Sequence, residues 1–167
     1  MSFETWKAEF MPEAPVDAAL ESTVSAVKHS MLKWEGLGEE NLAKHNGRKL
    51  VASSGTRFAE EERVAVMSVN SDTCALCLRF YSCVACPITA VRHGACCCIL
   101  TPDESHSPWQ AWTLEGDPIP MQKVLKAALL MVEAAGWAEP PSEELPAAEN
   151  LDYLKGIPFV MYHYDEE

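Results

Sequence analysis

Residues 74–98 read CALCLRFYSCVACPITAVRHGACCC and contain all seven cysteines of the chain. Two Cys-x2-Cys pairs open this stretch, Cys74 with Cys77 and Cys83 with Cys86. Each pair can form a tight turn whose two sulfurs point at one ion, and two pairs supply the four ligands of a structural zinc site. The stretch therefore predicts a cysteine-rich zinc-knuckle insert at about residues 72–102.

The spacing leaves the choice of ligands open. Common zinc modules separate their pairs by about a dozen residues or more, whereas Cys83 follows Cys77 closely. A ligand from the Cys96 to Cys98 run is therefore an alternative to one of the second pair. The expected metal ligands are four of five cysteines: Cys74, Cys77, Cys83, Cys86 and Cys98. We expect Arg79, Arg92 and His93 to offset part of the negative charge of a four-thiolate site.

Other uses of cysteine fit the stretch less well. A disulfide framework belongs to oxidising compartments, and the odd number of cysteines and the absence of a signal-peptide pattern at the N-terminus argue against one. A thioredoxin-like redox pair needs a strand–helix–strand context that is not evident here. Cys86-Pro87 is similar to the end of a ferredoxin cysteine run, so an iron–sulfur cluster is the alternative cofactor to zinc.

Several short motifs carry a resemblance: 74–77 (CALC), Cys83-x2-Cys86-Pro87 followed by an aliphatic residue, Cys98 shortly before Thr101-Pro102, and the phrases 34–37 (WEGL) and 40–45 (ENLAKH). Together they resemble a group of small uncharacterised bacteriophage proteins with the same order of cysteines, and the likeness spans about residues 31–112. The resemblance implies a phage origin, a metal-binding knot and Cys98 as the outlying ligand. It implies no activity. This chain departs from that pattern at three positions: the extra Cys96 and Cys97, and Leu100 in place of a glycine.

Length and composition indicate one folded domain over residues 1–167. Apolar residues make up 48% of the chain, and no apolar run is long enough to cross a bilayer. The net charge of -12 is concentrated after residue 137, where eight acidic residues face one lysine. Between residues 28 and 100, nine basic residues outnumber seven acidic ones. We expect a solvated surface that repels nucleic acid at long range, with DNA mimicry as the alternative use of the acidic charge.

Two helices are predicted from apolar spacing. From Val16 to Trp34 the apolar residues form one stripe, and a second stripe runs from Asp117 to Gly136. His29 lies off the first stripe and should face solvent. The first dozen residues read as an irregular lead-in whose aromatic side chains, Trp6 and Phe10, dock on the body.

The strands expected lie at residues 49–53, 63–69 and 158–164, and residues 138–150 read as an acidic, proline-rich loop. Trp109 and Trp112 fall in a connection rich in serine and proline, and should cover the metal module. The predicted fold class is α+β: two main amphipathic helices, a small antiparallel sheet and the cysteine-rich insert.

No catalytic motif is evident, since the chain lacks Gly-x-Ser-x-Gly, a phosphate-binding glycine loop and His-Glu-x2-His. The expectation is a non-enzymatic accessory protein that binds a host protein in the cytoplasm and does not enter a membrane. A zinc module associated with nucleic acid and an iron–sulfur or thiol redox protein are the alternative functions.

Overall fold

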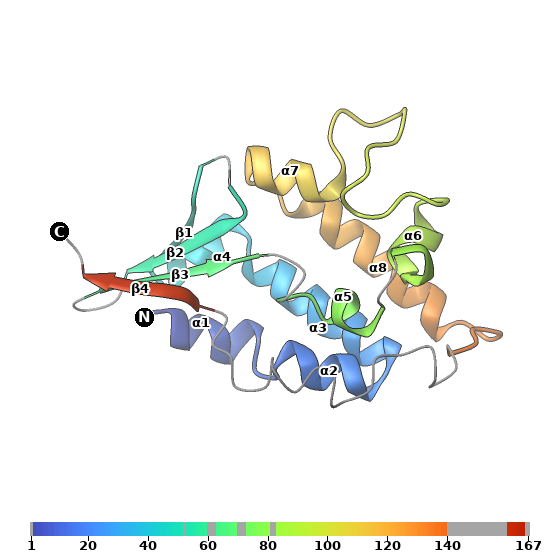
Figure 1. Ribbon diagram of the computed structural model, residues 1–167, viewed down its shortest axis with the longest axis horizontal. Coiled ribbons are helices and arrows are strands. Elements are labelled where there is room, and N and C mark those ends of the chain that lie inside the picture. Colours follow the sequence, from blue (N-terminus) through green and yellow to red (C-terminus); the bar gives the residue numbers. More distant parts are fainter. Residues whose placement is uncertain are drawn as a thin grey trace.

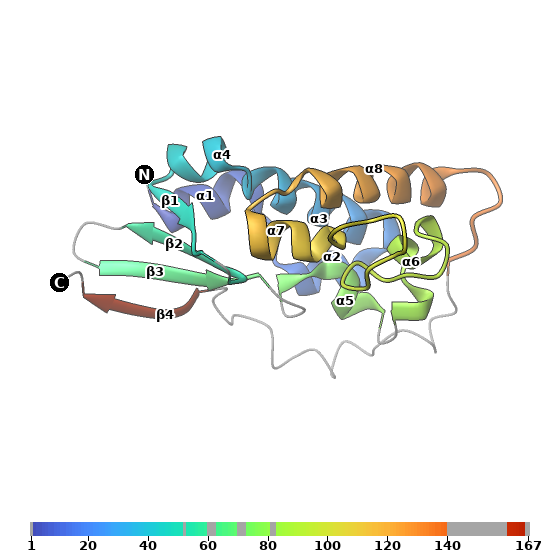
Figure 2. The ribbon, with the colours of Figure 1, turned by 90° about the horizontal axis from the view of Figure 1, so that it is seen from above.

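The computed structural model describes residues 2–51, 53–59, 63–69, 73–80 and 83–139, together with the backbone of 160–165. Figures 1 and 2 show an elongated arrangement, with a sheet at one end and a layer of helices extending from it. The predicted acidic loop at 138–150 lies outside the described residues from position 140 onward. Within the described part of the chain, no helix combines the length and the apolar character that a membrane span requires.

The sheet is antiparallel throughout. Among the described residues its order is β1-β2-β3-β4, from Gly47–Lys49, Gly55–Ala59, Arg63–Ser68 and Val160–Asp165. This confirms an α+β fold with a small antiparallel sheet. The strands predicted at 63–69 and 158–164 correspond to β3 and β4.

The hairpin between β1 and β2 differs from the prediction. Strand β1 ends at Lys49, because the N–H of Leu50 donates to the carbonyl of Gly55 at 2.9 Å and closes the turn there. The strand β2 was missed, since Gly55 suggested a break. Its period-two pattern was nevertheless present, because Thr56 and Phe58 are both fully buried and lie on one face.

The irregular lead-in was a wrong prediction, because α1 spans Phe3–Phe10. Ser2 and Thr5 form a capping box that starts the helix, and its apolar residues share one face. That face packs on the sheet: the Phe58 ring lies 5.4 Å from Phe3 and 5.5 Å from Trp6, centroid to centroid. The docking of Trp6 and Phe10 is confirmed, since they are 0% and 4% exposed.

The helix predicted from Val16 to Trp34 is broken in two. Helix α2 covers Pro15–Glu21 and α3 covers Thr23–Gly36. Between them Ser22 is extended, and its hydroxyl accepts the N–H of Ser25 at 3.0 Å, so it caps α3 instead of continuing α2. His29 is only 7% exposed, which corrects the expectation that it faces solvent.

The remaining helices surround α3. Short helix α4 is Glu39–Lys44, and the long α8, Ile119–Glu133, confirms the second predicted helix and packs along α3. Trp109 and Trp112 lie on α7, Pro108–Glu115, and not in an irregular connection, because Ser107 forms a capping box there. Trp112 is fully buried, with its ring 5.4 Å from that of Trp34.

Candidate metal centre

The first cysteine pair sits at the start of a short helix, directly after the sheet. Helix α5 is Ala75–Arg79, with Cys74 as its N-cap residue. The Cys74 sulfur accepts the backbone N–H of Cys77 at 3.4 Å, which is the turn expected of a Cys-x2-Cys pair. The helix packs against α2 and α3, so this pair is anchored to the helical layer.

The second pair spans a single 3-10 turn, η2, at Cys83–Ala85, followed by α6 at Pro87–Val91. Cys86 is the N-cap of α6, and its N–H donates to the carbonyl of Cys83 at 3.2 Å. Cys86 is half-buried against the core, whereas Cys83 is exposed. The two sulfurs of this pair therefore face different surroundings.

The last three cysteines occupy a turn after α6. The sulfurs of Cys96 and Cys98 lie 3.2 Å apart, while Cys97 packs against the hydrophobic core. The thiol of Cys83 lies near that of Cys96, and the thiol of Cys77 lies near that of Cys74, so that in each pair the ionisation of one sulfur affects the other.

These contacts sort the thiols into two sets. The inner thiols are Cys74, Cys86 and Cys97, which pack against the core, together with Cys77, whose exposed side chain lies next to Cys74. The outer thiols are Cys83, Cys96 and Cys98. The structure thus places three of the five expected ligands in the inner set and two in the outer set. Among the residues it describes, no three histidine, cysteine, aspartate or glutamate side chains converge closely enough to hold a metal ion.

A lysine below the inner thiols was not anticipated. Lys33 of α3 is 1% exposed, and its ammonium donates to the carbonyl of Thr73 at 2.9 Å. Burial lowers the pKa of Lys33, and ionised cysteines oppose this shift: Cys74, Cys77 and Cys97. A buried ammonium is costly unless an anion lies near it, so its position indicates that negative charge develops on the inner thiols.

The electrostatics of the first pair agree with this. The hydrogen bond from Cys77 and the nearby Lys33 ammonium lower the pKa of Cys74 to about 5, against the opposing effect of burial. The same hydrogen bond raises the pKa of Cys77. Burial raises the pKa of Cys86 to about 12, and it also raises that of Cys97. Among the inner thiols, the environment therefore favours one thiolate, at Cys74, in the metal-free protein.

The basic residues expected to offset thiolate charge are used differently. Arg79 is 4% exposed and donates to Glu139, to the Thr23 hydroxyl and to the Ala19 carbonyl. It ties α5 to α2 and α3 instead of facing the thiols.

Arg92 is also buried and binds the carboxylate of Glu104 together with backbone carbonyls of the loop after α6. His93 is exposed and adopts a left-handed backbone conformation, with φ 54°.

The signal in the sequence that could have identified Lys33 as buried is its position on α3. It extends the buried face of that helix defined by Ala26 and Ser30.

The chemical character of the inner thiols suits the binding of a thiophilic metal ion. They supply soft sulfur donors, a backbone N–H directed at Cys74 and a buried cation that balances negative charge. Such an ion would be held by cysteine thiolates and would crosslink α5, α6 and the turn at Cys97. Holding it requires the sulfurs to draw together from the positions described here.

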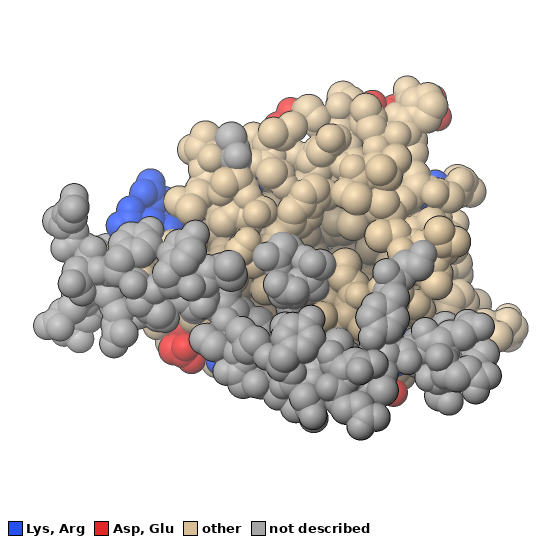
Figure 3. Space-filling model, in the orientation of Figure 1, with Lys and Arg blue, Asp and Glu red and all other residues tan. Residues whose placement is uncertain are grey.

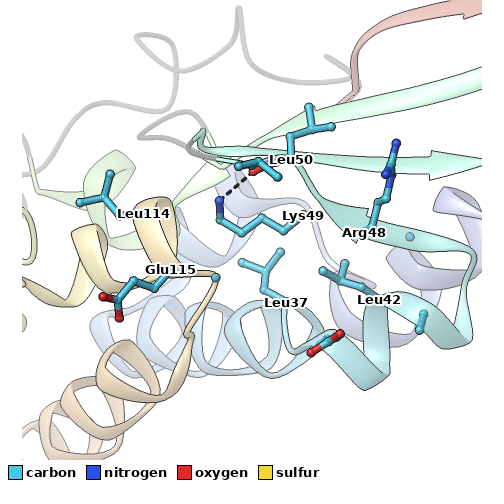
Figure 4. A pocket seen from close by; sticks show the side chains of 12 residues that line it. Leu37, Leu42, Arg48, Lys49, Leu50, Leu114 and Glu115 are labelled. Atoms are coloured by element: carbon cyan, nitrogen blue, oxygen red, sulfur yellow. Dashed lines mark hydrogen bonds between the residues drawn. The ribbon is translucent and has the colours of Figure 1, made fainter.

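A separate hollow of about 440 Å³ lies between α4, β1 and the end of α7. Its apolar lining includes Leu37, Leu42 and Leu114, and Figure 4 shows the Lys49 side chain extending among them. The Lys49 ammonium donates to the carbonyls of Leu50, Ser53 and Thr113 at 2.7–2.8 Å. Because these bonds occupy its three protons, Lys49 joins the hairpin to α7 and is not available to bind a ligand.

A hydrogen-bonded line of threonine, histidine and glutamate also lies away from the cysteines. His45 is buried, with Nδ1 2.8 Å from the Thr5 hydroxyl and Nε2 2.9 Å from a Glu9 carboxylate oxygen. The Thr5 hydroxyl already donates to the Ser2 carbonyl, and it accepts the Ser2 N–H in the capping box of α1. The line therefore fastens α1 to the end of α4 and does not present an activated nucleophile.

Comparison with known proteins adds no relative: no family model, curated protein or solved structure matches the chain.

Proposed function

We propose that this chain is a non-enzymatic accessory protein of a bacteriophage, with a structural zinc ion held by its cysteines, and that it acts in the host cytoplasm by binding a host protein. The observation that carries the zinc proposal is the buried Lys33 ammonium beneath the inner thiols. Its charge is best balanced when those sulfurs are thiolates, the form in which cysteine binds zinc. The phage origin rests on the resemblance of residues 31–112 to small phage proteins.

The binding proposal rests on the outer surface of the cysteine region. Three aliphatic side chains there are exposed: Val84 by 84%, Ile99 by 54% and Leu100 by 49%. Figure 3 shows mostly uncharged surface over the described part of the face it presents. Exposed aliphatic side chains next to a rigid metal site are suited to contact with another protein.

The arrangement of arginines favours a protein partner over nucleic acid. Arg79 and Arg92, the two arginines of the cysteine region, are buried and bound to carboxylates and carbonyls. They therefore cannot neutralise phosphates without breaking those bonds, and phosphate neutralisation supplies most nonspecific affinity for nucleic acid.

Elemental analysis tests the zinc. We expect about one zinc per chain in protein purified without chelator, and loss of that zinc in Cys74→Ser and Cys77→Ser. Protein that contains iron and a visible chromophore would favour the iron–sulfur alternative. Zinc content unchanged in both serine variants would refute a site built on the first pair.

A pull-down from bacterial lysate tests the partner. The wild-type chain should retain a stoichiometric protein that Ile99→Glu loses. Leu130→Glu is the matched control, because Leu130 is 67% exposed but lies on α8. A partner retained equally by wild type and Ile99→Glu, or the absence of any stoichiometric partner, would contradict binding through this surface.

A further inference from the structure

The turn that carries the last three cysteines presents two of them side by side. The N–H of Ile99 donates to the carbonyl of Cys96 at 3.1 Å and closes the turn. Within it Cys97 packs inward against the core, while the sulfurs of Cys96 and Cys98 meet at 3.2 Å and Cys98 is exposed.

A buried arginine holds this turn in shape. The guanidinium of Arg92, 8% exposed, donates to the carbonyls of Cys96 and Ile99, the two residues whose backbones close the turn. It also binds the carboxylate of Glu104, which in turn accepts the N–H of Thr101 at 3.2 Å. The backbone on either side of the two thiols is thus fixed by a charged network, so their proximity does not depend on side-chain packing alone.

We propose that Cys96 and Cys98 form a redox-active dithiol that closes to a disulfide by exchange with a small-molecule disulfide, and that neither is a zinc ligand. Consecutive Cα atoms lie about 3.8 Å apart, so a turn can hold residues two apart within the roughly 4.4–6.8 Å that a disulfide spans. The sulfurs need to approach by about 1.2 Å to reach a bond of about 2.05 Å.

The exchange takes two steps. The sulfur of one cysteine, after losing its proton, attacks a sulfur of glutathione disulfide, forms a mixed disulfide and releases one glutathione thiolate. The second cysteine then loses its proton and attacks the protein sulfur of that mixed disulfide, which forms the Cys96–Cys98 bond and releases the second glutathione. The protein loses two protons and two electrons, and the glutathione disulfide takes up both as two thiols.

This inference does not depend on the proposed zinc. The inner thiols remain available for a metal whether the outer pair is reduced or oxidised. Cys83, whose thiol lies near that of Cys96, is the competing partner within the outer set.

The test is thiol mapping of the full-length protein after equilibration with mixtures of glutathione and glutathione disulfide. Free thiols are alkylated, and the protein is then digested with trypsin. The tryptic peptide 93–123 contains Cys96, Cys97 and Cys98 and no other cysteine, whereas Cys83 and Cys86 fall in peptide 80–92. We expect the oxidised peptide 93–123 to carry a single alkyl group, on Cys97, and the same peptide of Cys97→Ser to carry none.

Two variants supply the controls, Cys97→Ser and Cys98→Ser. Cys98→Ser cannot form the Cys96–Cys98 bond, so its peptide 93–123 should carry two alkyl groups at reducing glutathione ratios and, where Cys96 has attacked glutathione disulfide, an unresolved glutathione adduct at oxidising ratios. This variant should bind as much zinc as wild type. In the wild-type protein, a crosslink between the two tryptic peptides, a glutathione adduct that does not resolve, or three alkylated thiols under all conditions would each overturn the proposal. So would loss of zinc in Cys98→Ser. Zinc measured on the same wild-type samples separates this result from the zinc proposal, since the disulfide can form in protein that contains no metal.

Discussion

Replacement of Lys33 by methionine tests the role of the buried cation under the thiols. Methionine keeps an unbranched side chain but removes the ammonium, and with it the hydrogen bond to the Thr73 carbonyl. In metal-free protein the loss of that bond, about 1.5–3 kcal/mol, is offset because an ammonium no longer has to be buried. The free energy of unfolding of the metal-free protein should therefore change little.

In zinc-bound protein the balance shifts, because a zinc ion held by four thiolates carries a net charge of about -2, against about -1 for the single Cys74 thiolate of the metal-free protein. An ammonium and a thiolate about 5 Å apart interact by roughly 3 kcal/mol at an effective dielectric constant of about 20. Loss of that attraction should weaken zinc binding by about 100-fold. The measurement is a competition titration of zinc against a chromophoric chelator at neutral pH.

The matched control for this variant is Lys28→Met on the same helix. The Lys28 side chain is 60% exposed and lies 3.6 Å from a Glu133 carboxylate oxygen, so its removal should leave zinc affinity unchanged. If Lys33→Met and Lys28→Met bound zinc equally well, the reasoning that links the buried cation to thiolate charge would be refuted.

Three further predictions concern the helices that support the site. In Gly36→Ala, the added Cβ would lie 2.4 Å from the Phe10 ring, so urea denaturation should show a loss of about 1–3 kcal/mol; an unchanged midpoint would contradict this close approach. Burial lowers the pKa of His29 to about 4 in the folded protein, whereas in the unfolded chain the imidazole takes up a proton near pH 6.5. The free energy of unfolding should therefore fall by about 2 kcal/mol between pH 7 and pH 5. Urea denaturation of His29→Gln at pH 7 and at pH 5 should show a smaller fall in the free energy of unfolding than wild type. An equal fall would assign the pH dependence to other groups. Burial alone would raise the pKa of Glu139, but hydrogen bonds from Thr23 and the charge of Arg79 outweigh burial and lower this pKa. The Glu139 carboxylate therefore stabilises the fold above about pH 4.5, and this stabilisation is lost as pH falls through the lowered pKa. Glu139→Gln should accordingly reduce Tm at pH 7, and this reduction should shrink as pH falls below about 4.5, whereas a reduction of the same size at every pH would exclude an electrostatic origin.

The sequence predicted the elements whose pattern is local. Helix α8 and strand β3 were identified because their apolar spacing repeats over several turns or residue pairs. The break at Ser22 was missed because the apolar stripe continues through it, and the stripe carries no information about a serine hydroxyl that caps the next helix. The lead-in was misread for a similar reason, since the capping box at Ser2 is only a short signal.

In the candidate site, too, local sequence patterns predicted some features and missed those that depend on tertiary packing. The Cys-x2-Cys turn at Cys74 follows from spacing alone, and the structure contains it. The sequence could not sort the thiols of Cys97 and Cys98, which are adjacent in the chain, because the direction of each side chain depends on how the turn is fixed by Arg92 and the core.

By its sequence alone this protein is an α+β chain whose cysteines are concentrated in residues 74–98, because helix periodicity, strand alternation and cysteine spacing are properties of neighbouring residues. Only the tertiary structure determined that Lys33 is buried beneath the inner thiols and that Cys96 lies against Cys98 at the surface. The Lys33 contact joins positions 40 residues apart, and it forms because α5 packs on α3. Such a contact depends on the packing of whole elements, which no local pattern encodes.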